Sequence, residues 1–548
     1  MGRMPEFETR CLSSLVKVFP DEELKDKTFN HASALLNETY SFQVAYRKNG
    51  DSPKKIKVRM EGALQNVATI RSVGLVPSEF PCYLDHDDYV LRTTPGLYPD
   101  PLYPLDHNEV PVPKNQWRSV WVTVNLNEKI QAGLQQIKLV FETAAGEQIG
   151  EETFELEIIP ASLPEQRLIC TQWFHADCLA THYDVDVFSE EHWNLIEQYV
   201  QTATVHGMNM LLTPLFTPPL DTDVGQERPT VQLVEVEKTG AKYQFNFDKL
   251  TRWIDLCLNN GIKYVEFSHL FTQWGAEHAP KIMANENGKL KKIFGWETDA
   301  SGREYKDFLS QLFPELIAYI KHHKLEEQVY FHVSDEPNIN NLESYKKASE
   351  LIHDYLSDFP VIDALSDYQF YGQGLVKNPI PANDHMEPFL ENKVPNLWTY
   401  YCCAQYKKVS NRFFNFPSAR NRISGIQLYK YNIAGFLHWG YNFWYSRLSR
   451  KKINPFQNTD ADGGFPSGDS FLVYPGEDGP IESIRMEVFY DALQDLRALQ
   501  LLEKLTGRDR VLEIIEEQIP ITFTDYPHGS EWLLTMREKI NQKISEVN

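Results

Sequence analysis

From residue 168 to residue 474, short apolar runs alternate with longer helical or loop segments, and this alternation constrains the fold more than any other feature. Eight runs have the length and apolar character of strands: 168–174, 208–215, 262–267, 329–333, 361–365, 397–401, 435–439 and 471–474. Eight strands separated by helices or long loops are typical of a (β/α)8 barrel. We therefore expect an α/β fold with a TIM-like barrel at 163–510.

Helices are predicted between and after these runs. Ser189 should cap a helix that runs to about Val205, because a serine side chain at this position accepts a backbone N–H. Further helices are expected at 301–323, 341–357, 416–430 and 481–505. A polar insertion at 217–246 contains its own alternating hairpin pattern.

The segment before the barrel has a different pattern. Between about residues 8 and 160, short alternating apolar stretches are separated by Gly, Pro and Asn clusters, which indicates an antiparallel β-sandwich. Residues 160–164, Pro-Ala-Ser-Leu-Pro, are typical of a stiff linker. We expect three parts: a β-sandwich at 1–162, the barrel at 163–510, and a helical extension at 511–548 packed on the barrel.

Composition excludes several functional classes. The net charge of -22 argues against non-specific binding to nucleic acid or to an anionic membrane. No run of about 18 uncharged apolar residues occurs, so no membrane span is expected. Seven scattered cysteines without C-x-x-C spacing indicate a reduced compartment, and the first twenty residues lack the apolar core of a secretory signal. We therefore expect a cytoplasmic protein.

Two adjacent acids, Asp335 and Glu336, follow the fourth apolar run and precede Pro337. Neighbouring side chains of a regular strand point to opposite faces, so both acids can serve one site only where the strand ends. Pro337 supplies that end, because proline cannot donate to a sheet and restricts the residue before it. Since barrel active sites lie at the carboxyl ends of strands, this pair is a candidate catalytic site. The alternative is that the acids cap the helix at 341–357.

Aromatic and polar residues cluster at the other strand ends. Aromatic rings pack on the apolar C–H face of a sugar while polar groups pair with its hydroxyls, so this set favours a carbohydrate site. Any single member is also well explained as a core residue. The candidate substrate-binding residues are His175, Asp177, Trp274, Tyr368, Tyr371, Trp398, Tyr400, Trp439, Asn442 and Trp444.

The placement of the acids restricts the chemistry. A retaining glycosidase of the usual kind needs two carboxyl groups about 5 Å apart on opposite sides of the anomeric carbon, and adjacent residues do not readily flank a sugar in this way. No Asp or Glu occurs at 392–459, so these later strands supply no nucleophile. A 2-acetamido sugar can instead attack its own anomeric carbon through its carbonyl oxygen. One acid then moves the proton, and its neighbour balances the charge that develops on the oxazolinium ring.

Three motifs together resemble glycoside hydrolase family 123. They are Asp335-Glu336 after a barrel strand, Gly-Phe-Leu-His-Trp-Gly-Tyr-Asn-Phe-Trp at 435–444, and Phe-Leu-Val-Tyr-Pro-Gly at 471–476 with Ile484-Arg485 following. The resemblance covers residues from about 168 to 502. It implies a β-N-acetylgalactosaminidase that acts with retention by substrate assistance and needs no cofactor. On this resemblance Asp335 orients and stabilises the acetamido group, while Glu336 is the general acid and then the base for water.

The resemblance implies an exo-acting hydrolase of carbohydrate metabolism that removes terminal β-linked N-acetylgalactosamine from oligosaccharides or glycolipid-derived glycans. One alternative is a β-N-acetylglucosaminidase, because the residues do not reveal which epimer at carbon four is accepted. The other is a catalytically silent carbohydrate-binding protein that retains the barrel. The sequence does not predict the oligomeric state.

The sequence contains two further, weaker signals. Residues 458–469 imitate a calcium loop, but no helix flanks them and a proline occupies a late position, so no metal site is expected. The acid-free stretch at 392–459 carries eleven Lys and Arg residues, which raises the hypothesis of a preference for anionic glycans. The favoured interpretation is a solvated helix face, with Arg412, Arg420, Arg422 and Lys430 pointing away from the site.

Overall fold

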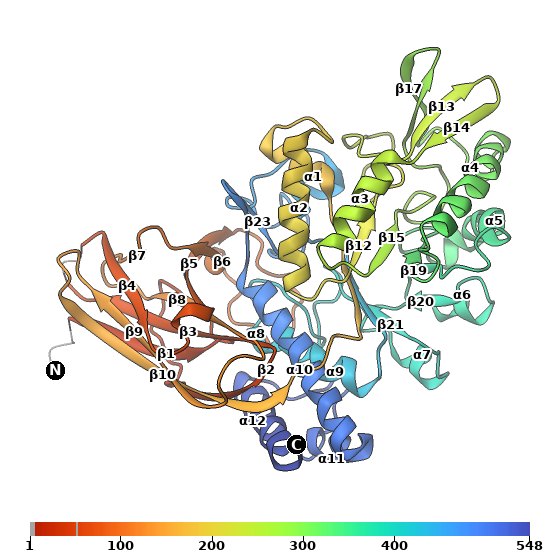
Figure 1. The fold of residues 1–548 in the computed structure, drawn as a ribbon. Helices are drawn as coiled ribbons and strands as arrows, with labels where there is room; N and C mark the ends of the chain where they lie inside the picture. The colour runs from red at the N-terminus through yellow and green to blue at the C-terminus, as the bar shows by residue number, and fades with distance from the viewer. Residues whose placement is uncertain (1–5, 51–52) are drawn as a thin grey trace.

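The computed structural model describes residues 6–50 and 53–548, so the first five of the residues considered for a signal lie outside it. The chain forms a mixed α/β fold in which an N-terminal β-rich region lies beside a larger α/β region (Figure 1). None of the helices in the described residues is long and apolar enough to cross a membrane.

The β-rich region consists of two five-stranded sheets that share one apolar core. Phe42 of one sheet stacks on Phe154 of the other, with ring centroids 4.1 Å apart. All neighbouring strands are antiparallel except β2 and β10, which pair in parallel and so depart from the predicted pattern. In order of pairing, one sheet contains β1 (Phe7–Ser13), β3 (Glu38–Lys48), β8 (Arg118–Leu126), β5 (Ala68–Ser78) and β6 (Gly96–Pro104), and the other β2 (His31–Leu36), β10 (Gln148–Ser162), β9 (Gly133–Glu142), β4 (Lys55–Glu61) and β7 (Glu109–Pro111).

The α/β region is built on a six-stranded parallel sheet that forms a half-barrel. Its strands, in order of pairing, are β18 (Val329–Tyr330), β15 (Tyr264–Phe267), β12 (Met210–Thr213), β11 (Ile169–Gln172), β22 (Gly435–His438) and β21 (Trp398–Tyr400). A second parallel pair, β19 (Ile362–Ala364) and β20 (Asn378–Ile380), lies between the two edge strands. Isolated parallel bridges join Phe331 to Val361 and Ala382 to Tyr400.

Seven of the eight predicted strands lie in these parallel sheets, and the eighth prediction was wrong. Tyr474 begins β23 (Tyr474–Gly476), which pairs only with β24 (Gly479–Ile481) in an antiparallel hairpin. Phe471 and the two residues after it are fully buried, so their apolar character reflects core packing rather than a barrel strand. The position between β19 and β21 is taken by β20, whose Asn-Pro-Ile sequence gave no strand signal because proline disrupts the pattern.

The predicted helices are present and lie outside the parallel strands (Figure 1). The Ser189 side chain accepts the N–H of His192 and caps α2 (Glu190–Val205), as predicted. The other long helices are α3 (Asp248–Asn259), α4 (Arg303–His322), α5 (Leu342–His353), α10 (Ile484–Thr506) and α12 (Ser530–Val547). Shorter ones are α1 (Ala176–Tyr183), α6 (Tyr368–Gly372), α7 (Glu387–Glu391), α8 (Ser418–Arg422), α9 (Ser424–Lys430) and α11 (Arg508–Ile515).

The insertion after β12 contributes a small separate sheet. The predicted hairpin is formed by β13 (Glu235–Thr239) and β14 (Lys242–Asn246). It pairs with a second hairpin that the sequence pattern did not predict, β16 (Ile282–Glu286) and β17 (Lys289–Phe294).

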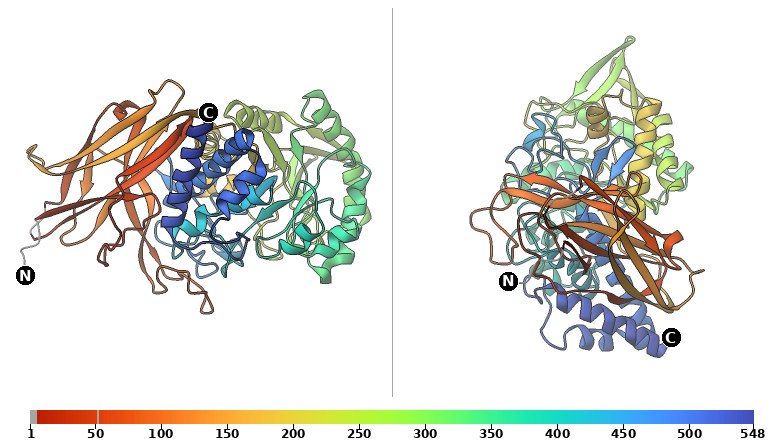
Figure 2. Two further views of the ribbon diagram at one scale, coloured as in Figure 1. Left: turned by 90° about the horizontal axis from the view of Figure 1, so that it is seen from below. Right: turned by 90° about the vertical axis from the view of Figure 1, so that its left-hand side faces the viewer.

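The C-terminal helix lies at the junction of the two regions (Figure 2). Arg537 of α12 pairs with Glu38 of β3 at 2.6 Å and with Asp495 of α10 at 2.8 Å. A second buried pair, Arg485 with Asp100 at 2.8 Å, also joins the α/β region to the β-rich region. The predicted extension therefore contacts both regions, not the barrel alone.

Candidate active site

A cavity of about 230 Å³ opens where the parallel strands end. Every parallel strand except β20 contributes residues at or after its carboxyl end to the wall, the end at which α/β barrels place their active sites. Its lining residues are Trp173, Leu220, Asp221, Gln273, Trp274, Asp335, Glu336, Ala364, Tyr400, Cys402, Cys403, Leu437, Trp439, Arg447 and Phe465.

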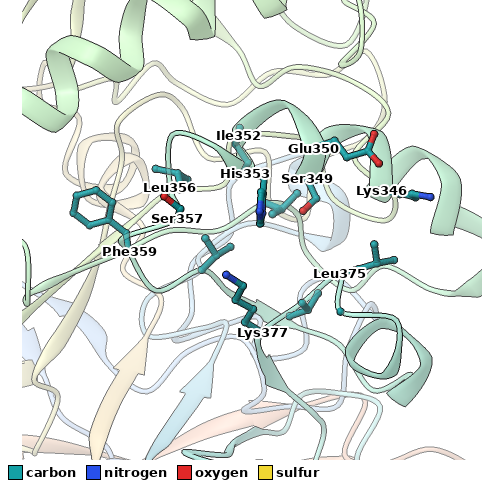
Figure 3. Close-up of a pocket in the computed structure, with 14 residues that line it drawn as sticks. Lys346, Ser349, Glu350, Ile352, His353, Leu356, Ser357, Phe359, Leu375 and Lys377 are labelled. Carbon is teal, nitrogen blue, oxygen red and sulfur yellow. The ribbon is translucent and has the colours of Figure 1, made fainter.

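A second cavity, of about 260 Å³, lies outside the strands between α5 and the loop after α6 (Figure 3). Its floor is apolar, and its polar lining includes Lys346, His353 and Lys377 with Glu350 as the one acid. The two cavities have similar volumes, so volume alone does not identify the active site. The cavity at the strand ends is the better candidate, because it holds paired carboxyl groups beside aromatic rings.

The backbone after β18 turns both adjacent acids into the first cavity. Glu336 adopts a left-handed conformation with φ of 43°, and its N–H donates to the carbonyl of Ala364 at 3.0 Å. The carbonyl of Asp335 accepts the N–H of Trp274 at 2.8 Å. This conformation is costly for a residue other than glycine, and here hydrogen bonds to two neighbouring segments hold it. β18 ends at Tyr330, so the acids lie in the segment after the strand, where both line one wall of the cavity.

Burial raises the pKa of both carboxyl groups. The charge of Glu336 raises the pKa of Asp335 further, and the two therefore titrate as a pair. The Tyr400 hydroxyl donates to Oε1 of Glu336 at 2.7 Å and partly offsets the effect of burial on the pKa of Glu336. The pair retains a proton at a pH where an exposed carboxyl group would have lost it.

A buried charge network lies directly before the acid pair in the chain. The imidazole of His332 contacts Glu266 Oε1 through Nε2 at 2.6 Å and Asp363 Oδ1 through Nδ1 at 3.3 Å. Burial alone would lower the pKa of His332, but its hydrogen bonds to the two carboxylates raise it to about 9. The resulting positive charge favours the ionised form of Asp335. Tyr345 completes the network by donating its hydroxyl to Asp363.

Three of the predicted substrate-binding residues line this cavity with the acids. Trp274 is 44% exposed. Tyr400 lies against Glu336. Trp439 presents its ring to the cavity and donates Nε1–H to Asp469 Oδ2 at 2.9 Å. Burial raises the pKa of Asp469 to about 7. These aromatic surfaces match the expected sugar-binding character.

The other predicted substrate-binding residues lie away from the cavity lining. His175 and Asp177 form a buried cluster with Arg228, and Asn442 bonds to the backbone of His175 at 2.8 and 3.1 Å. Asn442 thus holds the segment after β11 against the loop after β22, and Arg228 joins the same segment to the insertion after β12. The remaining four are packed elsewhere: Trp398 against Gly435, Trp444 under the carbonyl of Val473, and Tyr368 and Tyr371 against each other on α6.

The Asp177→Asn variant should be less stable than the wild type by about 3 kcal/mol, because it leaves the buried guanidinium of Arg228 without its counter-charge. In the native protein Asp177 accepts hydrogen bonds from Arg228 Nε at 2.8 Å and Nη2 at 2.7 Å. Urea unfolding measures this change. The control is Asp186→Asn, at an exposed position of the following loop. Equal unfolding midpoints for the two variants would contradict the prediction.

Several cavity residues were missed from the sequence. Asp221 lies in the loop after β12, where its Oδ2 accepts the N–H of Leu448 at 2.8 Å and burial raises its pKa to about 6. Cys402 lies 4.0 Å from Glu336 Oε1 through its sulfur. Arg447 and Phe465 come from the long segment after β22. Of these residues, only Cys402 could have been found from the sequence, because it directly follows the apolar run at 397–401. Asp221, Arg447 and Phe465 lie in loops without a pattern that indicates a site.

The acids of the calcium-like segment have other partners. Asp460 accepts the N–H groups of Gly463 and Phe80, at 2.9 and 3.1 Å, and Asp462 pairs with Lys451 at 2.7 Å. Asp469 contacts the ring of Trp439. Within residues 6–50 and 53–548, no group of three His, Cys, Asp or Glu side chains is placed to hold a metal ion.

The comparison with family models identifies one family. Residues 173–502, more than half of the chain, match the family model described as glycoside hydrolase 123, catalytic domain. A solved family 123 glycoside hydrolase from Clostridium perfringens, reported for glycolipid glycan hydrolysis, is 15% identical with a TM-score of 0.77, and 98% of each chain is covered. At this identity the likeness shows a shared fold.

Other solved structures match this chain only weakly. A putative beta-galactosidase from Bacteroides fragilis is 10% identical with a TM-score of 0.30, covering 84% of this chain and 58% of that chain. A family 5 mannosidase from Rhizomucor miehei is 11% identical with a TM-score of 0.33, covering 63% and 95%. No curated protein matches the chain.

Proposed function

This chain belongs to glycoside hydrolase family 123, and we propose that it releases terminal β-linked N-acetylgalactosamine from oligosaccharides or glycolipid-derived glycans with retention of configuration. One observation carries the proposal. Asp335 and Glu336 are adjacent in the chain and line one wall of the strand-end cavity. Two carboxyl groups on one wall do not flank an anomeric carbon, so they suit a substrate that supplies its own nucleophile.

In the first step the carbonyl oxygen of the 2-acetamido group attacks the anomeric carbon, and the bond to the leaving-group oxygen breaks. Glu336 gives its proton to that oxygen, and the sugar becomes an oxazolinium ion. Asp335 accepts the acetamido N–H and balances the positive charge. In the second step Glu336 takes a proton from water, which attacks the anomeric carbon from the face that the leaving group vacated. The bond between the anomeric carbon and the acetamido oxygen breaks, and the acetamido group is restored.

The electrostatics of the site fit this division of roles. Burial raises the pKa of Glu336 and keeps the proton that the leaving group needs. The pKa of Asp335 is also raised in the empty cavity. Asp335 must therefore lose its proton when the substrate binds in order to balance the positive charge. An acetamido N–H and a developing positive charge both favour its ionised form, as does the charge of His332. Stabilisation by Asp335 therefore grows towards the transition state.

Asp221 supports one competing mechanism, because it is a third carboxyl group on the cavity lining. A conventional retaining enzyme would use it as a nucleophile and form a covalent glycosyl ester. The hydrogen bond from Leu448 to Asp221 and the raised pKa both weaken it as a nucleophile. Other glycosides of the same class, including β-N-acetylglucosaminides, and a catalytically silent carbohydrate-binding role remain alternatives.

Chromogenic glycosides test these alternatives together. We expect hydrolysis of the 4-nitrophenyl β-glycoside of N-acetylgalactosamine, with slower hydrolysis of the N-acetylglucosamine epimer. The galactoside with a plain hydroxyl at carbon two should resist, because it has no internal nucleophile. Rapid cleavage of this galactoside, or mass-spectrometric detection of a glycosyl ester on Asp221, would refute substrate assistance. No hydrolysis of any of the three would favour the silent binding role.

We also infer that the parallel strands close into an eight-stranded barrel preceded by a β-sandwich. The pair β19 and β20 occupies the gap between β18 and β21, and the bridges at Phe331 and Ala382 support closure on both sides. The cytoplasmic location and the domain boundaries at 162 and 510 stay predictions.

A further inference from the structure

One cation lines the strand-end cavity and has no hydrogen-bond or ion-pair partner among the described residues. Arg447 lines the cavity and is exposed. Among the residues that the structure describes, its guanidinium has no ion pair and no hydrogen bond. Most of the other Lys and Arg residues of the acid-free stretch are paired or buried. Arg420 binds Asp87, Arg422 binds Asp495, and Lys430 binds Glu516, each at 2.6–2.8 Å.

These contacts correct the solvated-face interpretation of the stretch. Arg412, Arg420 and Arg422 point away from the cavity as expected, but they are buried. Arg412 donates to His438 Nδ1 at 2.8 Å and to the carbonyl of Asp469 at 3.0 Å. These three arginines therefore stabilise the fold through their hydrogen bonds and ion pairs, whereas the guanidinium of Arg447 makes no such contact with the described residues.

The loop that carries Arg447 is held in place from both sides. Leu448 donates its N–H to Asp221 Oδ2 at 2.8 Å, and the Ser449 hydroxyl donates to the Asp221 carbonyl at 2.6 Å. The N–H of Arg447 donates to the carbonyl of Ala461 at 2.9 Å. A Cβ atom at Gly464 would lie 2.5 Å from Arg447 Cβ, so the arginine stem rests directly on this glycine. The backbone of Arg447 is thus fixed while its charged end stays free.

We propose that Arg447 forms a subsite for an anionic substituent of the glycan, a sulfate or a carboxylate on the terminal sugar or on the sugar next to it. The planar guanidinium can bind either group through two parallel hydrogen bonds. Trp439 and Phe465 line the same cavity and provide apolar surface for the ring that carries the anion. This inference rests on the proposed function and specifies which glycans the site takes best.

Asp221 is the one competing explanation for Arg447. The charge of Arg447 lowers the pKa of Asp221 against the larger effect of burial, so the arginine could serve only as a counter-charge. No hydrogen bond joins the two side chains in the described structure. A counter-charge role would alter the pH dependence for neutral and anionic substrates alike, whereas an anion subsite alters their ratio.

The experiment compares kcat/KM for four substrates: the neutral 4-nitrophenyl N-acetylgalactosaminide, its 4-sulfated form, its 6-sulfated form, and an oligosaccharide whose second sugar carries a sialic acid. The sulfated arm reports an anion on the terminal sugar, and the sialylated arm one on its neighbour. The wild type should prefer at least one anionic substrate over its uncharged equivalent, and added salt should reduce the preference.

The Arg447→Ala variant should lower the ratio of anionic to neutral kcat/KM by roughly tenfold or more, as for the loss of a hydrogen bond to a charged group. Arg447→Lys should restore part of the ratio, because it keeps the charge without the paired donors. Lys452→Ala is the matched control, since it removes an exposed cation of the same segment that does not line the cavity. It should leave the ratio unchanged.

The inference is overturned if the wild type shows no anionic preference or if Arg447→Ala leaves the ratio unchanged. Activity on the neutral substrate with an unchanged ratio would reject the subsite and keep the proposed function. Absence of activity on every glycoside would reject the proposed function itself. An anionic preference that Lys452→Ala reduces equally would assign the effect to the overall charge of the segment and reject the subsite.

Discussion

The Glu336→Gln variant is expected to lose about 10²- to 10⁴-fold in kcat/KM for glycosides whose leaving group must be protonated. Glutamine has no acidic proton, so the leaving-group oxygen would depart with a full negative charge. For strongly activated phenols the loss in the first step should be much smaller, because such groups leave without help. The selectivity of the loss, rather than its size, identifies Glu336 as the proton donor.

A series of aryl glycosides of increasing leaving-group pKa measures this selectivity. The dependence of kcat/KM on leaving-group pKa should become steeper in the variant. Azide should also accelerate the variant with an activated substrate, because it attacks the oxazolinium ion without needing a base, and the product should be the β-glycosyl azide. Glu343→Gln, at an exposed position of α5, serves as the control. Equal losses across the series would remove Glu336 from the role of acid.

The pH dependence follows from the same group. Activity in the first step requires the protonated acid, so kcat/KM should fall as the pH rises through the pKa of Glu336. Burial raises that pKa above its usual range, which moves the fall to higher pH. Tyr400 acts in the opposite direction, since its hydrogen bond favours the carboxylate. Tyr400→Phe should therefore shift this limb further towards high pH.

Features that depend on neighbouring residues could be predicted from the sequence. The cap at Ser189 follows from one side chain and the N–H three residues later. The acid pair was predicted to serve one site at a strand end marked by Pro337. The strand ends earlier, at Tyr330, but both acids do line one cavity. The conformation that places them there, a left-handed Glu336 bonded to Ala364, involves a second strand and left no trace in the local pattern.

Features that depend on distant segments could not be predicted. His332 lies between Glu266 and Asp363, which come from two other strands, so no local spacing reveals the network. The same reason explains why aromatic residues after strands were poor predictors of cavity lining. His175 and Trp444 follow strands as Trp439 does, but their loops fold back into the protein, where Arg228 and Val473 supply their partners. Asp221 and Arg447 reach the cavity because their loops bind each other.

The Asp335→Asn variant should lose about 10²- to 10³-fold in kcat/KM with every leaving group, as for removal of one electrostatic contact to a developing charge. Asparagine can still accept the acetamido N–H, so substrate binding should change less than kcat. The neutral amide cannot balance the positive charge of the oxazolinium ion. Loss of the neighbouring negative charge should also make Glu336 easier to ionise, because like charges no longer oppose each other.

N-acyl substrates with increasing fluorine substitution separate this role from a structural one. Fluorine weakens the carbonyl oxygen as a nucleophile, so kcat of the wild type should fall steeply along the series if the substrate supplies the attack. The kcat of the Asp335→Asn variant should fall less steeply along the series if its transition state carries less charge on the oxazolinium ring. Asp367→Asn is the control, because this acid caps α6 and does not line the cavity. A variant of Asp335 with wild-type activity, or a wild type insensitive to fluorination, would leave both adjacent acids without the roles assigned to them.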